Sequence, residues 1–213
     1  VESHRRAAAA IAAGRFRDQI VPVEIKSRKK TVVFDQDEHV RTDVTLEELS
    51  KLPAIFKEGG TVTAGNASGI NDGAAAVVLA SRASVARHGL RPLGRLVAYA
   101  HAGVEPELMG IGPVPAVRRV MERAKLSIRD MDVIESNEAF AAQALAVQRE
   151  LGLPQDRTNP NGSGISIGHP VGATGCIITV KALYELQRIQ GNHALVSMCI
   201  GGGQGIAAIF ARE

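Results

Sequence analysis

The chain has 213 residues, 45% of them apolar and only 3% aromatic, and a formal net charge of +3. This length and apolar content predict a globular protein of one large domain or one and a half. The small charge gives no reason to expect nucleic acid as a partner. No apolar run reaches the ~20 residues needed to cross a bilayer, and no signal peptide is visible. We therefore expect a cytoplasmic protein with no membrane partner.

Two further features of the composition bear on ligands. The two cysteines, Cys176 and Cys199, lack Cys-x-x-Cys spacing, so neither a metal site nor a disulfide framework is indicated. Basic residues cluster near the start of the chain, where they form either a solvated face, the default interpretation, or a landing zone for a phosphorylated ligand. The cluster comprises Arg5, Arg6, Arg15, Arg17, Lys26, Arg28, Lys29 and Lys30.

The first part of the chain predicts short elements and long loops. We expect a helix over 2–14, strands over 20–25 and 31–34, a turn over 26–30, and a short helix that Thr45 caps. Glycines and small polar residues then dominate 60–73. We expect a short helix over 71–75, a strand over 76–81, and a helix over 81–88 that Gly89 closes.

From residue 93 the pattern alternates regularly between strands and helices. We expect strands over 94–102, 133–136, 158–161, 193–199 and 205–211, with helices over 114–124, 138–151 and 174–190. The order βαβαβαββ predicts an α/β fold, a mixed five-stranded sheet covered by helices, preceded by a loop-rich region.

A glycine-rich stretch over 161–175 contains a single histidine, His169, directly before Pro170. Glycine lets the backbone pass close to a ligand, and proline stiffens the turn. The helix expected next would offer free N–H groups at its first turn. A titratable ring on such a turn suits a catalytic acid or base, although an isolated histidine on a tight turn is more often a surface residue.

Two more loops follow expected strands and carry polar groups. Asn137 follows the strand at 133–136, and Cys199 precedes the glycine turn at 201–203. Sites in such sheets form beyond the carboxyl ends of the strands. If the three loops meet there, an asparagine, a histidine, a cysteine and backbone N–H groups converge. These groups provide acid/base chemistry and an oxyanion hole.

Three motifs in these loops resemble the C-terminal signatures of the thiolases. They are Asn137-Glu-Ala-Phe-Ala, Gly168-His-Pro-Val-Gly-Ala-Thr-Gly and Cys199-Ile-Gly-Gly-Gly-Gln-Gly. A fourth stretch, Thr61-Val-Thr-Ala-Gly-Asn-Ala-Ser-Gly-Ile-Asn-Asp-Gly, is also similar to the family. The resemblance covers the whole chain and is strongest to bacterial acetyl-CoA acetyltransferases and short-chain β-ketothiolases of polyhydroxyalkanoate pathways. The related ketoacyl synthases are an alternative, but they typically carry a second histidine where this chain has Asn137.

The resemblance implies a role for each matching residue. His169 would activate a nucleophilic cysteine and help form one oxyanion hole, which a water on Asn137 completes. Cys199 would be the acid/base at the acetyl-CoA methyl group, and the Gly201 N–H would serve a second oxyanion hole. Coenzyme A would be a substrate or product, with no separate cofactor. The residues implied to contact coenzyme A or the acyl group are Arg41, Phe56, Ala64, Ser68, Met109 and Phe140.

The family's nucleophilic cysteine, found in a Cys-x-Ser-Gly type motif, has no match in these 213 residues. The resemblance therefore implies the C-terminal half of a thiolase. Residues 1–70 would be part of the loop domain that covers coenzyme A, 71–92 a remnant of the N-terminal domain, and 93–213 the C-terminal domain. We expect exposed apolar surface at 71–92 and poor stability of the chain alone.

Three hypotheses follow for the reaction. The chain is a thiolase fragment, one subunit of a split thiolase, or a catalytically inactive CoA-binding module. An active enzyme would condense two acetyl-CoA into acetoacetyl-CoA and CoA, or cleave short 3-ketoacyl-CoA. Its partners would be these thioesters, the N-terminal half of the thiolase, and further copies in a homodimer or tetramer.

Overall fold

A computed structural model of the protein describes residues 1–28 and 30–213. Lys29, a member of the basic cluster and of the expected turn at 26–30, lies outside the described residues. The regular elements in chain order are α1 (Glu2–Ala12), β1 (Val23–Lys26), β2 (Thr31–Phe34), α2 (Leu46–Ser50), α3 (Arg82–His88), β3 (Gly94–Gly103), η1 (Pro106–Ile111), α4 (Pro113–Ala124), η2 (Ile128–Asp130), β4 (Val133–Ser136), α5 (Ala141–Leu151), α6 (Gly164–Ile167), α7 (Thr174–Ile189), β5 (His193–Ile200) and β6 (Gln204–Arg212).

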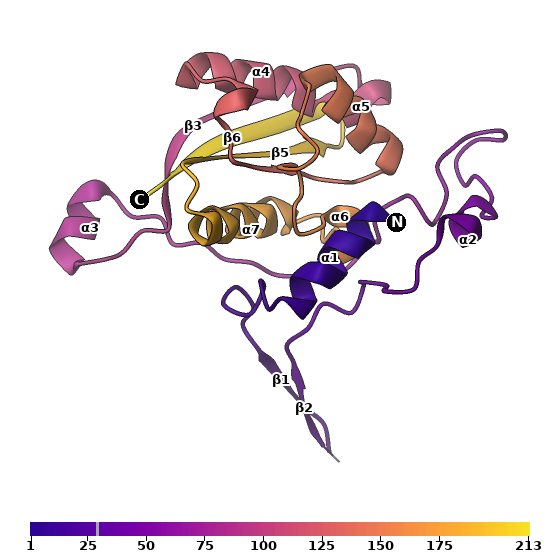
Figure 1. The fold of residues 1–213 in the computed structure, drawn as a ribbon, viewed down its shortest axis with the longest axis horizontal. Coiled ribbons are helices and arrows are strands. Elements are labelled where there is room, and N and C mark those ends of the chain that lie inside the picture. Colours follow the sequence, from indigo (N-terminus) through magenta and orange to yellow (C-terminus); the bar gives the residue numbers. More distant parts are fainter. Residues whose placement is uncertain (29) are drawn as a thin grey trace.

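A mixed sheet in the order β3-β6-β5-β4 forms the centre of the molecule. Strand β6 pairs antiparallel with β3 and β5, and β5 pairs parallel with β4. Helices α4 and α5 cover one face of the sheet, and α7 covers the other (Figure 1). The predicted α/β class, a mixed sheet covered by helices, is confirmed.

The core consists of two layers of small and branched side chains on the two faces of the sheet. Successive strand residues point to opposite faces. Ala194 and Val196 of β5 therefore pack on the α7 side, whereas Leu195 packs on the α4 side. With few aromatic residues available, alanine, valine, leucine and isoleucine fill most of both layers.

The sheet has four strands, so the prediction of five is wrong in number. The segment at 158–161 makes a single parallel bridge, between Thr158 and Ile134. Asn159 has a φ of 49°, which is outside the strand region. Its side chain replaces the backbone ladder: Oδ1 accepts from the Ser136 N–H at 2.9 Å, and Nδ2 donates to the Ser136 carbonyl at 2.8 Å.

Residues 71–81 form neither the helix nor the strand expected there. A strand needs a neighbour to pair with, and among the described residues no strand pairs with this segment. Val78 and Leu79 are 94% and 87% exposed. The expectation of exposed apolar surface in this part of the chain is confirmed.

The N-terminal third packs on the α7 side of the sheet and partly projects from it. Helix α1 buries Ser3, Ala7 and Ala10 and lies beside α6 (Figure 1). The β1–β2 hairpin is exposed on both faces and extends away from the sheet. Its first strand begins after Pro22, which has no N–H for a ladder. Within the described ranges, no helix is long and apolar enough to span a membrane.

Candidate active site

The parallel pair β4 and β5 brings two of the predicted residues to one edge of the sheet. Parallel strands end on the same side, so Asn137, which follows β4, lies near the end of β5. The Asn137 N–H donates to the Ser197 carbonyl at 2.9 Å, and Cys199 follows two residues later in β5. Asn137 is 1% exposed and Cys199 is 5% exposed. Burial raises the pKa of the Cys199 thiol above its ordinary value.

The His169 loop reaches this edge from the turn between α6 and α7. His169 Nε2 lies 3.5 Å from Asn137 Nδ2, so the structure brings these two predicted residues together. Gly168 before it has a φ of 102°, and a Cβ there would contact the Asn71 amide. The loop therefore requires glycine at this position. Burial lowers the pKa of His169 below its ordinary value and so favours the neutral ring.

The glycine turn after Cys199 continues the same edge. Gly202 and Gly203 have φ angles of 83° and 85°. The Gly203 carbonyl accepts from the Val104 N–H at 2.7 Å. Gly201 is exposed, and a Cβ added there would meet nothing within 4 Å. This open space beside Gly201 leaves its backbone accessible to a ligand. Among the described residues, no hydrogen bond joins Cys199 to His169.

We expect Gly203→Ala to destabilise the protein by about 1–3 kcal/mol, because a non-glycine residue is strained at this φ. The added Cβ would also overlap the Val104 carbonyl oxygen. Gly201→Ala is the matched control, with no positive φ and no close neighbour, and its stability should stay within about 0.5 kcal/mol of the parent. Urea unfolding measures both. Equal midpoints for the two variants would contradict this account of the turn.

Three of the predicted coenzyme A and acyl contacts lie beside the Asn137 loop. The Ser68 N–H donates to the Ala139 carbonyl at 2.9 Å. The Phe56 and Phe140 rings meet edge to face, with centroids 6.0 Å apart. Phe56 is 72% exposed, which leaves much of its ring free to line a ligand site.

The other three predicted coenzyme A and acyl contacts, Ala64, Met109 and Arg41, are more dispersed. Ala64 is exposed on a turn closed by the Asn66 N–H and the Thr63 carbonyl. Met109 lies in η1, and its neighbour Gly110 packs against the Gln143 side chain of α5. Arg41 is exposed, and its N–H donates to His4 Nδ1 at 3.1 Å, which places it beside α1.

Comparison with known proteins identifies the family. The model of the thiolase C-terminal domain matches residues 90–212, and that of the thiolase N-terminal domain matches residues 1–83. The chain belongs to the thiolase family. The resemblance read from the sequence motifs is thus confirmed.

Named thiolases match the chain along its whole length. β-Ketothiolase BktB of Cupriavidus necator is 67% identical over 100% of this chain, and the match covers 54% of that protein. The 3-oxoadipyl-CoA/3-oxo-5,6-dehydrosuberyl-CoA thiolase of Escherichia coli is 56% identical, again over 100% of this chain and 54% of its own length.

Solved thiolase structures share the fold closely. Acetyl-CoA acetyltransferase of Bacillus anthracis superposes with a TM-score of 0.97 at 50% identity, over 99% of this chain and 54% of that chain. Human mitochondrial 3-ketoacyl-CoA thiolase in complex with CoA superposes with a TM-score of 0.92 at 48% identity, over 100% of this chain and 53% of that chain. This thiolase chain spans about half the length of the relatives it matches.

Two residues that hold the thiolase histidine loop lie within the quoted motifs, but the sequence analysis gives them no role. Asn71 Oδ1 accepts from the His169 N–H at 3.1 Å, and Thr174 Oγ1 lies 2.7 Å from His169 Nδ1. Asn71 is 98 positions from His169, so no local spacing links them. Thr174 lies five residues after His169 at the start of α7, and its position beside a loop histidine is a signal that could have found it.

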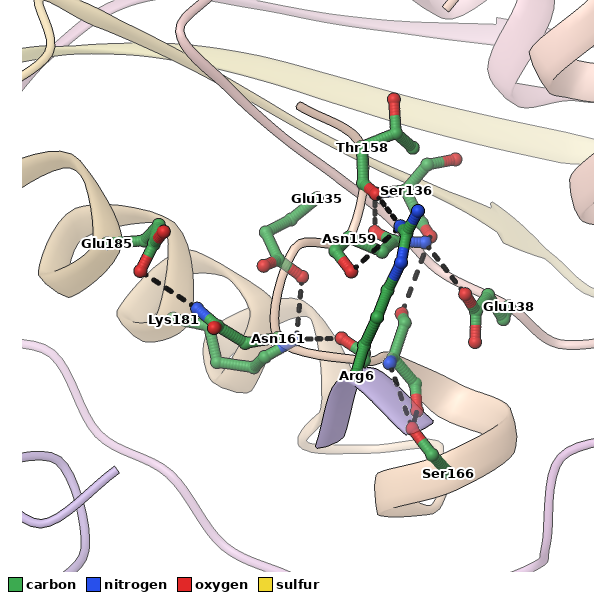
Figure 2. A network of polar contacts seen from close by, with 12 residues as sticks. Arg6, Glu135, Ser136, Glu138, Thr158, Asn159, Asn161, Ser166, Lys181 and Glu185 are labelled. Carbon is green, nitrogen blue, oxygen red and sulfur yellow. Dashed lines mark hydrogen bonds and ion pairs between the residues drawn. The ribbon is translucent and has the colours of Figure 1, made fainter. Parts of the chain in front are cut away.

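A buried polar network supports the loop on the other side of Asn137. Figure 2 shows Lys181 reaching from α7 toward Glu135 of β4. Lys181 Nζ donates to Glu135 Oε2 at 2.7 Å and to the Gly162 carbonyl at 2.6 Å. Asn161 Nδ2 donates to Glu185 Oε2 at 2.9 Å. The network fixes the segment before α6 to β4, the strand that directly precedes Asn137.

Among the described residues, hollows also occur away from the contact between Asn137 and His169. One of about 390 Å³ is lined by Asn71, Pro170 and Cys176, beside the His169 loop. Another, of about 500 Å³, is lined by arginines of the basic cluster. Their guanidinium groups are bonded to protein acceptors, Arg6 to the Thr158 carbonyl and Arg15 to Asn161 Oδ1 at 2.8 Å. Because these guanidinium groups already bind protein acceptors, the bonds argue against a landing zone for a phosphorylated ligand in this region.

Proposed function

We propose that this chain provides the histidine–asparagine–cysteine part of a thiolase active site that acts on short acyl-CoA thioesters. The observation that carries the proposal is the meeting of Asn137 and His169 at the sheet edge where Cys199 and its glycine turn also end. The reaction would be the reversible condensation of two acetyl-CoA into acetoacetyl-CoA and CoA, or thiolysis of a short 3-ketoacyl-CoA.

In thiolysis, His169 would take the proton of a nucleophilic cysteine, whose sulfur attacks the 3-keto carbon. The bond between C2 and C3 breaks, and the acetyl-CoA carbanion takes its proton from Cys199. The thiol of a second CoA then gives up its proton to the Cys199 thiolate, and its sulfur attacks the acyl carbon. The nucleophilic cysteine leaves and takes its proton back from His169. A buried thiol with a raised pKa stays protonated until the carbanion forms, which suits this role.

The nucleophilic cysteine would come from a further polypeptide segment. Neither Cys176 nor Cys199 lies in a Cys-x-Ser-Gly type motif. The relatives are about twice as long as this chain, which supports a second segment of similar size. The exposed Val78 and Leu79 would be covered in that assembly. Exposed apolar side chains on the β1–β2 hairpin, such as Val23 and Val33, support a homodimer or tetramer as the final state.

Acetoacetyl-CoA thiolysis tests the proposal, with the intact mass checked in the same sample. The chain alone should give no turnover when only its own mass is present. Co-expression with the part of Cupriavidus necator β-ketothiolase that this chain does not match should restore turnover. Turnover without a second polypeptide would mean that Cys199 or Cys176 is the nucleophile. A soluble complex that binds CoA but stays inactive would favour the binding-module hypothesis.

A further inference from the structure

The Nδ1 side of the His169 ring contacts the hydroxyl group of Thr174, whose proton is donated to a backbone carbonyl. Thr174 Oγ1 lies 2.7 Å from His169 Nδ1 and 2.9 Å from the Pro170 carbonyl oxygen. Thr174 is 2% exposed, so water does not compete for these bonds. A carbonyl oxygen only accepts hydrogen bonds, so the hydroxyl proton lies between Thr174 and Pro170.

Thr174 Oγ1 is therefore the acceptor toward the imidazole. The ring must carry its proton on Nδ1, and the lone pair is on Nε2. In the reverse assignment, the hydroxyl would donate to Nδ1 and leave two oxygens 2.9 Å apart with no proton between them. On the far side of the ring, Nε2 faces Asn137 Nδ2 at 3.5 Å, and an amide nitrogen suits an acceptor there.

The backbone of His169 is fixed independently of its ring. Its N–H points to Asn71 Oδ1 at 3.1 Å and to the Gly69 carbonyl at 3.3 Å. Pro170 also restricts the backbone of the residue before it, which is His169. With the backbone held, the remaining freedom of the side chain is rotation of the ring and the choice of tautomer, and Thr174 acts on both.

We propose that Thr174 is a positioning residue that fixes His169 in the Nδ1–H tautomer and so presents Nε2 as the base. This inference rests on the proposed function, which gives His169 the proton of the nucleophilic cysteine. When Nε2 takes that proton, the Nδ1–H bond to Thr174 remains in place. The hydroxyl does not need to reorient during the transfer.

The tautomer can be read directly from ¹⁵N NMR of the histidine-labelled chain, above the pKa of His169. The parent chain should show a protonated Nδ1 and an unprotonated Nε2. Thr174→Val, which keeps the shape but removes the hydroxyl, should increase the Nε2–H form. Thr174→Ser should behave as the parent. Thr179→Val is the matched control, because Thr179 Oγ1 also donates to a carbonyl four residues earlier, at 2.8 Å, and among the described residues it has no hydrogen bond to a histidine.

An Nε2–H tautomer in the parent chain would overturn the inference, even if Thr174→Val did not fold. An unchanged tautomer in folded Thr174→Val would also overturn it. In the complex assembled for the thiolysis assay, Thr174→Val should lower kcat about 10²-fold with KM unchanged, and Thr174→Ser should recover it. The NMR result needs no turnover. An inactive complex with the expected tautomer would therefore count against the proposed function and leave the role of Thr174 standing.

Discussion

Replacing Lys181 with methionine is expected to lower the free energy of unfolding by about 3–5 kcal/mol, the usual cost of removing one partner from a buried ion pair. Lys181 and Glu135 are 4% and 0% exposed. The variant leaves the Glu135 carboxyl in an apolar interior, where its Oε1 already has no hydrogen-bond partner among the described residues. It also removes the donor to the Gly162 carbonyl. Urea unfolding at pH 8 measures the loss.

The cost should depend on pH in a defined direction. Burial raises the pKa of Glu135 from 4.5 to about 7, against the opposing charge of Lys181. A carboxyl with a raised folded-state pKa adds stability below about pH 4.5 and loses that contribution as the pH rises through about 7. Without Lys181 the pKa rises further, and ionising Glu135 becomes more costly. The Lys181→Met penalty should therefore be larger at pH 8 than at pH 5.5.

Two controls separate this effect from the general loss of a lysine. Lys51→Met removes an exposed pair with Glu47 at a similar distance, 2.8 Å against 2.7 Å for the buried pair, and should change stability by less than about 1 kcal/mol. The double variant Lys181→Met with Glu135→Leu removes both buried charges and should recover much of the loss. Equal destabilisation by Lys181→Met and Lys51→Met would show that the buried pair contributes nothing specific.

His169→Ala is expected to lower kcat about 10²–10⁴-fold in the assembled thiolase complex, because it removes the proposed general base. Burial lowers the pKa of His169, so the ring of the parent enzyme should remain a base below its ordinary pKa of 6.5. The acid-side fall in the activity of the parent should therefore lie below that pH. Acetoacetyl-CoA thiolysis across the pH range measures both effects.

The matched control is His193→Ala, at the start of β5 and at the opposite end of that strand from Cys199. Its activity should stay close to that of the parent complex, while its unfolding reports any structural cost. A His169→Ala complex that retained more than about a tenth of the parent kcat would remove His169 from the role of general base.

Much of the fold follows from signals that are local in the sequence. Helices α4, α5 and α7 and the strands of the sheet lie close to their predicted ranges, because apolar periodicity, glycine and proline mark them. The strand expected at 76–81 fails because a strand depends on its neighbour. The one expected at 158–161 fails because the Asn159 side chain occupies the Ser136 hydrogen-bonding groups.

The same distinction applies to the candidate site. Asn137, His169 and Cys199 are visible in the sequence because each lies in a motif at the end of a strand or in a glycine-rich turn. The contacts that hold them are long-range. Lys181 precedes Glu185 by four residues, the spacing of an exposed helical pair, yet it turns inward to Glu135 on β4. Only the packing of α7 on the sheet shows which carboxylate it meets.

The Asn159 side chain also covers backbone groups at an edge of the sheet, where a strand of another molecule could otherwise pair. Strand β4 is one edge of the sheet, and a bare edge can recruit a strand from another molecule. The backbone N–H and carbonyl of Ser136 are both hydrogen-bonded to the Asn159 side-chain amide. At the opposite edge, Arg119 and Arg123 of α4 donate to the His101 and Tyr99 carbonyls of β3. Side chains thus occupy backbone groups at both edges of the sheet, which disfavours pairing with a strand of another molecule.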